Sequence, residues 1–297
     1  MEKAKVYFTK EITPESLIKI YDALGVKLKG KIAVKISTGE PGGHNFLNPN
    51  LIKDLVNKID GTIVECCTAY RGRRFEVADH LQTFKDHGFA AIAPCDLLDE
   101  EGEIKLPIKN GKHLKGYDIV GSHITSYDST LILSHFKGHQ MGGFGGAIKN
   151  VSIGFATRNG KAWIHSVGQT VDPDSMMKDL FVYKQTDFLE SMAEACSAVV
   201  DYFKPENMLY INVANNLSTE CDCSSNPSKP EMADIGIFAS TDPVALDQCC
   251  YDTVKNSNDP KKASLVQRMD SKQGIHTVEE ACRLGLGTRE YEVINID

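Results

Sequence analysis

At 297 residues, with 41% hydrophobic and 25% charged residues, the chain has the size and composition of a globular protein with a large core. Its formal net charge of −7 argues against a nucleic-acid-binding surface. Residues 1–5 carry no apolar signal segment, and no apolar run reaches the length of a membrane span. We therefore expect a cytoplasmic protein that binds neither membranes nor nucleic acids.

Predicted strands and helices alternate along the first half of the chain. Apolar or β-branched segments bounded by turn residues predict strands, and capping residues before a periodic apolar pattern predict helices. The expected strands are 4–8, 31–37, 61–67, 89–94, 117–124, 129–135, 207–213, 234–239 and 291–296. The expected helices are 14–24, 49–59, 75–87, 176–202 (one long helix or two), 243–252, 262–269 and 277–284, and RNGK at 158–161 predicts a turn.

This alternation predicts an α/β fold with mostly parallel or mixed sheets and helices on both faces. We expect one domain over residues 1–297. The alternative is two α/β lobes, about 1–130 and 131–297, with the functional site between them.

A stretch rich in histidine, lysine and glycine follows the strand 129–135, with the sequence SHFKGHQMGGFGGAIKN at residues 134–150. Its glycines let several backbone N–H groups point at one place and its lysines add positive charge, which suits an anionic small molecule or a metal-bound one. The alternative is a plain turn whose polar side chains are satisfied locally. The Gly-Lys-Ser/Thr ending of a nucleotide-hydrolase loop is absent, so no nucleotide cofactor is expected. The candidate residues are Lys137, His139, Gly145, Gly146, Lys149 and Asn150, and the role of His135 stays open.

Two other predicted strand ends carry polar side chains, and ligands collect at such ends in open α/β sheets. Lys35 lies near the end of one strand and His44 in the loop that follows, where the alternative for His44 is a solvated surface turn. Arg71 follows the strand 61–67 and offers a fork of donors for a carboxylate or phosphate. Cys66 and Cys67 end that strand, and their roles stay open.

Nine cysteines cannot all pair in internal disulfides, because the number is odd. Cys221 and Cys223 follow the predicted strand 207–213, and two thiolates this close can reach one metal. Soft thiolate ligands favour zinc or an iron–sulfur cluster over magnesium, and the alternative is a pair of free loop cysteines. Asp242 precedes a proline at a helix start, so a capping role competes with a ligand-binding role.

Motifs in a fixed order resemble one family. They are SHFKGH at 134–139, GGAIKN at 145–150, CDC at 221–223, and DIGIFAS and DPVALD within 234–247. They are similar to the iron–sulfur-associated family called domain of unknown function 362, over about residues 31–251. Many members carry an inserted two-cluster ferredoxin module, which is absent here because residues 150–165 contain no cysteine. The core that the resemblance carries over is Lys137, His139, Lys149, Asn150, Cys221, Cys223 and Asp242. In fold, the chain also resembles the nickel-dependent lactate racemases.

Two functions fit these residues. The first is a metal- or iron–sulfur-dependent enzyme, with redox chemistry favoured by the cysteines, that acts on a small anionic substrate. Lys137 and Lys149 would hold the anion, His139 would transfer a proton, and Cys221 and Cys223 would bind the metal ion or cluster. A separate ferredoxin is an expected partner. The second function is non-catalytic binding or transport of a metal, a cluster or an anionic metabolite.

Overall fold

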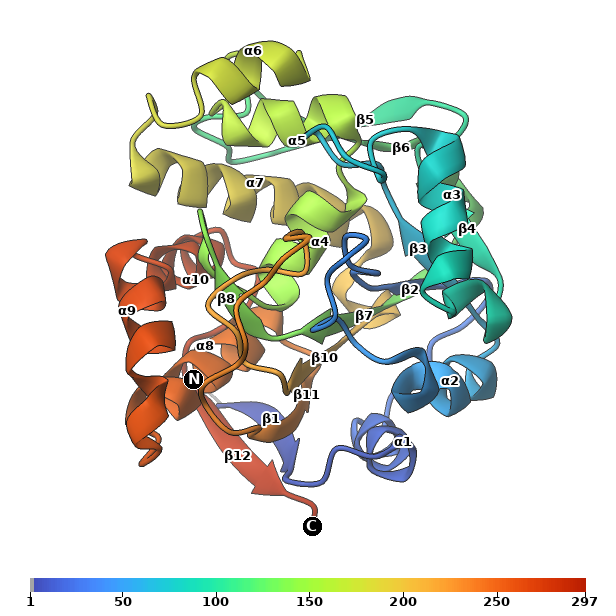
Figure 1. Cartoon of the computed structure of the whole chain (residues 1–297), viewed down its shortest axis with the longest axis vertical. Coiled ribbons are helices and arrows are strands. Elements are labelled where there is room, and N and C mark those ends of the chain that lie inside the picture. The colour runs from blue at the N-terminus through green and yellow to red at the C-terminus, as the bar shows by residue number, and fades with distance from the viewer. Residues whose placement is uncertain (1–2) are drawn as a thin grey trace.

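Strands from both halves of the chain share one large sheet (Figure 1). The computed structural model describes residues 3–297. Within these residues the strands are β1 (Ala4–Thr9), β2 (Ile32–Lys35), β3 (Gly61–Glu65), β4 (Cys95–Leu97), β5 (Glu103–Pro107), β6 (Tyr117–Gly121), β7 (Ser129–His135), β8 (Lys137–His139), β9 (Gly143–Gly145), β10 (Met208–Ala214), β11 (Gly236–Ser240) and β12 (Tyr291–Asn295).

Eight of these strands form a mixed sheet in the order β12-β1-β11-β10-β7-β2-β3-β4. Five neighbouring pairs are parallel, and only β1–β11 and β10–β11 are antiparallel. The remaining strands form two hairpins, β5–β6 and β8–β9. The predicted α/β class with a mostly parallel or mixed sheet is therefore confirmed.

Helices cover both faces of the sheet (Figure 1). None of those in residues 3–297 has the length and apolar character needed to cross a membrane. Their bounds are α1 (Pro14–Ala23), α2 (Pro49–Lys58), α3 (Val77–Asp86), α4 (Ala147–Phe155), α5 (Arg158–His165), α6 (Pro173–Lys178), α7 (Gln185–Phe203), α8 (Pro243–Asn256), α9 (Ala263–Ser271) and α10 (Ile275–Arg283).

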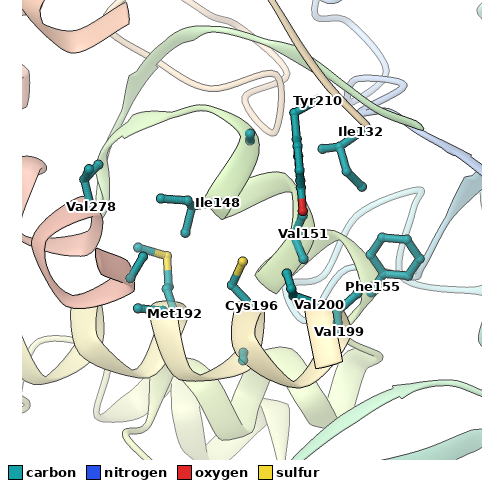
Figure 2. Close-up of a cluster of buried hydrophobic side chains, with 14 of the residues drawn as sticks. Ile132, Ile148, Val151, Phe155, Met192, Cys196, Val199, Val200, Tyr210 and Val278 are labelled. Atoms are coloured by element: carbon teal, nitrogen blue, oxygen red, sulfur yellow. The ribbon is translucent and has the colours of Figure 1, made fainter. Parts of the chain in front are cut away.

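Alternate residues of the central strands feed two hydrophobic cores, because successive side chains of a strand point to opposite faces. On β7, Leu131 and Leu133 join the core beneath α1, α2 and α3, and Ile132 joins the core beneath α4, α7 and α8. Figure 2 shows the second core, in which Ile148 of α4 faces Met192 and neighbouring side chains of α7. The position of α4 against the sheet is therefore set by burial on two sides.

Two local predictions were wrong. The segment 89–94 is not a strand: Phe89–Ala91 forms a single 3-10 turn, and the strand that pairs with β3 is β4, further along the chain. Residues 158–161 are not a turn but the first turn of α5, where the Thr157 side chain accepts a hydrogen bond from the Gly160 N–H. The segment predicted as one long helix or two contains two helices, α6 and α7.

The N-terminus of α4 is held by a carboxylate from α8. Asp247 accepts hydrogen bonds from the backbone N–H groups of Ala147 (2.8 Å) and Ile148 (2.9 Å) and from the Asn212 side chain (2.8 Å). A Cβ on Gly146 would lie only 2.3 Å from the Asp247 carboxylate, so this approach requires glycine. Burial raises the pKa of Asp247 to about 6 despite these three donors.

We predict that Asp247→Ala lowers the free energy of unfolding by about 2–4 kcal/mol at pH 7.5, because it leaves buried N–H donors without acceptors. Urea unfolding measures the change. Asn256→Ala, at the exposed end of the same helix, is the control and should change stability by less than about 0.5 kcal/mol. An equal effect of both substitutions would contradict the capping role of Asp247.

Candidate functional site

A cavity of about 340 Å³ lies where β2 and β3 end, beside α4. Lys35 and Glu65 reach it from the last residues of these two strands, and Lys149 and Asn150 reach it from the first turn of α4. The Asn150 amide donates to the backbone oxygen of Lys35 (3.1 Å) and to the Ser134 hydroxyl (3.0 Å), which fastens the helix to the sheet edge. The site is thus at the carboxyl edge of parallel strands, as the sequence predicts.

Two thiols and an imidazole meet on the cavity wall. The ligand atoms of His139, Cys221 and Cys223 lie within 4.8 Å of one another. Cys221 also accepts a hydrogen bond from the backbone N–H of Cys223 (3.2 Å). The hydrogen bond from the Cys223 thiol, together with the nearby charge of Lys149, lowers the pKa of Cys221 well below the ordinary thiol value despite burial. This is a group of soft donors that could hold a metal ion.

The residue between the two cysteines anchors their loop. Both oxygens of the buried Asp222 side chain are engaged, one by His135 Nδ1 (2.8 Å) and the other by the Lys137 ammonium (2.8 Å). These neighbours keep the pKa of Asp222 far below its ordinary value, although burial alone would raise it. A Cβ on Gly138 would meet the backbone oxygen of Thr219 at 2.5 Å, so the close approach of the two segments also needs glycine.

His139 has a defined proton position. Its Nδ1 accepts hydrogen bonds from the backbone N–H groups of Met141 (3.2 Å) and Gly142 (2.8 Å), so the proton of the neutral ring is on Nε2. The side chain is also hydrogen-bonded to Cys221. Burial and the neighbouring Lys149 lower the pKa of His139, which keeps the ring neutral. His139 is therefore arranged to donate to the Cys221 sulfur.

Positive charge exceeds negative charge around the cavity. Arg74 is balanced by Glu40 (2.9 Å) and Glu65 (3.4 Å). Among residues 3–297, however, neither Lys149 nor Lys161 forms an ion pair, and both line the cavity. Such an excess on the wall of a cavity favours an anionic ligand.

Lys35 is 2% exposed at the base of the site. Burial lowers its pKa to about 8, against the opposing charge of Glu65. Glu65 itself stays ionised: burial alone would raise its pKa, but Lys35, His80 and Arg74 keep it far below the ordinary value. Lys35 thus changes charge just above neutral pH, whereas Glu65 keeps its charge.

The structure brings six of the predicted site residues to the cavity, and the others lie elsewhere. Lys137 is buried, pairs with Asp222 and does not line the cavity. His44 is exposed in its loop, and Arg71 lies in an outer recess, where it pairs with Asp174 (3.0 Å).

Asp242 caps α8, accepting from the N–H groups of Val244 and Ala245 (both 2.9 Å). Gly145 and Gly146 lie outside the cavity wall, and the amides after them are paired with Asp247. The six in the cavity are Lys35, His139, Lys149, Asn150, Cys221 and Cys223.

Lys161 and His165 of α5 also line the cavity and are outside the set of predicted site residues. They are four residues apart and so share one face of the helix, a signal that the sequence does contain. The prediction of a turn at 158–161 concealed it. The Nδ1 atom of His165 pairs with the Lys161 carbonyl oxygen (2.7 Å), and burial lowers the pKa of His165 to about 4, so the ring is neutral.

The segments that form the cavity belong to a region that matches a known family. A family model described as "Domain of unknown function (DUF362)" matches residues 32–252. The chain belongs to this family. No curated protein matches the chain.

Two solved structures share a similar arrangement. One is the lactate racemase apoprotein from Thermoanaerobacterium thermosaccharolyticum, with 13% identity and a TM-score of 0.45, covering 84% of this chain and 56% of that one. The other is a protein from Thermotoga maritima, with 12% identity and a TM-score of 0.42, covering 93% of this chain and 59% of that one. The DUF362 chain thus spans less than two thirds of either protein.

We predict that Lys137→Met lowers the free energy of unfolding by about 3–5 kcal/mol, because it leaves the buried Asp222 charge without its ammonium partner. In a double-mutant cycle with Asp222→Asn, the two effects should be far from additive. Urea unfolding of the four proteins measures the coupling. Lys58→Met removes an exposed ion pair with Asp22 and is the control, with an expected change below about 1 kcal/mol. Additive effects of Lys137→Met and Asp222→Asn would show that the two side chains do not stabilise each other.

Proposed function

We propose that this DUF362 protein is an enzyme that acts on a small organic anion and uses a soft metal ion held by His139, Cys221 and Cys223. The carrying observation is the placement of these three donors and of two lysines, Lys35 and Lys149, on the wall of one cavity. Three protein ligands leave an open position on a metal ion, which is the arrangement of catalytic zinc sites rather than structural ones.

The donor set favours one metal ion over an iron–sulfur cluster. A [4Fe–4S] cluster is commonly held by four cysteine thiolates, and the group of metal-competent side chains found within residues 3–297 has two. Cys66 also lines the cavity, but its thiol donates to the backbone oxygen of Phe155 (3.2 Å), and burial raises its pKa well above the ordinary value. Redox chemistry and a separate ferredoxin partner belong to this proposal only if the bound ion is redox-active.

The protein residues divide the work. Lys149 and Lys35 would bind and orient the anion by charge-assisted hydrogen bonds. When bound, the metal ion would supply Lewis-acid polarisation of a substrate oxygen. His139 would move a proton only in metal-free protein, because a metal on Nε2 displaces the proton held there. Because Nδ1 accepts from the N–H groups of Met141 and Gly142, binding of an ion to Nε2 would require the Nε2 proton to leave the ring or to move to Nδ1.

We predict that protein purified without oxygen contains close to one equivalent of zinc, nickel or iron, and that Cys221→Ser with Cys223→Ser removes it. Elemental analysis with acid-labile sulfide and an absorption spectrum makes the measurement. Cys282→Ser, on α10 and outside the cavity, is the control and should keep the metal. A metal content that survives the double substitution overturns the ligand assignment, and iron with matching sulfide would replace the single ion by a cluster.

We also predict that binding of a small carboxylate such as propionate weakens as the pH rises through about 8. The free Lys35 ammonium has a lowered pKa, so it is charged below that pH and increasingly neutral above it. Titration calorimetry between pH 6.5 and 9.5 measures this, and loss of one charged hydrogen bond costs roughly tenfold to a hundredfold in affinity. Lys35→Met should bind weakly at every pH with a flatter profile. An unchanged profile in that variant would assign the titration to another group.

A further inference from the structure

One wall of the cavity is apolar, in contrast to the charged groups at the sheet edge. Ala69, Met176 and Leu180 line the cavity and pack together in a small hydrophobic cluster that is separate from the two main cores. Met177 and Ile153 are further apolar residues of the cavity lining. The cluster contributes to no other core, so lining the cavity is its evident structural role.

The apolar wall and the cationic groups come from different parts of the fold. The cationic groups lie where β2 ends and where α4 and α5 face the cavity. The apolar wall comes largely from α6 and the residue Leu180 that follows it, and Figure 1 shows α6 at the outer edge of the molecule, beyond α5. A ligand that contacts both must therefore have a charged end and an apolar end.

Water alone would leave this wall poorly solvated. Met177 is 46% exposed although it lines the cavity, so part of its apolar surface faces the opening. Covering such surface with an apolar group is favourable in proportion to the area removed from water. A cavity of about 340 Å³ is within the size range of small-molecule sites.

We propose that the ligand of this cavity is an amphipathic carboxylate: its carboxylate is bound by Lys149 and Lys35, and an apolar chain of several carbons packs on Met176, Met177 and Leu180. This inference rests on the proposed function and specifies its substrate class. A two-carbon acid would fill the charged end alone and leave the apolar wall wet. Each methylene group that reaches the wall should raise the affinity about threefold to fourfold.

The test is titration calorimetry of the full chain, as purified and with its metal content measured, against acetate, butyrate and hexanoate at constant pH and ionic strength. We expect affinity to rise along the series. Met177→Gln and Leu180→Gln should flatten that rise while leaving acetate binding unchanged. Phe181→Gln is the matched control, because Phe181 follows Leu180 but is 83% exposed and does not line the cavity. It should keep the wild-type series.

The variant Lys149→Met distinguishes failure of the amphipathic-ligand proposal from failure of the proposed function. It should weaken binding of every acid by a similar factor, because each shares the carboxylate. Equal affinity for all three acids, with this loss intact, overturns the amphipathic ligand and leaves the proposed function standing. If no acid binds, or if Lys149→Met has no effect on any of them, both fail. A rise in affinity that survives Met177→Gln and Leu180→Gln also overturns the assignment of the wall.

Discussion

The buried ion pair between Asp222 and Lys137 is the contact on which the arrangement of the site depends. Asp222 lies between the two cysteines, so its ion pair anchors the backbone segment that carries both thiols. His135 is the second partner of the Asp222 carboxylate, and its Nε2 lies 2.7 Å from the Asn215 carbonyl oxygen. Because removal of one partner leaves the other charge buried and unpaired, such a pair specifies one geometry even where its net contribution to stability is small.

Asp222, Lys137 and His135 meet because of where the strands lie in the sheet. β7 is parallel to both β10 and β2, so the segments that follow these three strands leave the sheet at the same edge. The loop that carries Cys221 and Cys223 follows β10 in the chain. His135 ends β7, Lys137 begins β8, and Lys35 ends β2. Chain segments nearly 200 residues apart thus supply one cavity. Hydrophobic packing places α4 between the sheet and α7 (Figure 2), and Lys149 in its first turn lines the cavity near Cys221.

The sequence was sufficient for elements whose signal is local. Most strands, the capped helices and the strand-end position of Lys35 followed from periodicity and turn residues, because burial on a sheet imposes a short repeat. Long-range contacts were the limit. The glycine-rich stretch predicts an anion-binding backbone, but the carboxylate beside Gly146 is Asp247, about 100 residues away. Asn159 and Gly160 are typical of a turn, but the segment packs as the helix α5 against β6 and α7 and brings His165 to the cavity.

Lys137 and Lys149 illustrate why residue type alone cannot assign a role. Both lie in the stretch 134–150, and a Cβ on Gly145 would lie within 4 Å of each side chain. Lys137 is committed to Asp222, and its charge is cancelled inside the protein. Lys149 forms no ion pair with a carboxylate among the described residues and lines the cavity, near the Cys221 thiol. Lys149 is half-buried, and a partly desolvated positive charge without a carboxylate partner would gain from a ligand that brings a negative charge. The lysine without a carboxylate partner, rather than the paired one, is therefore the group that an anionic ligand would stabilise.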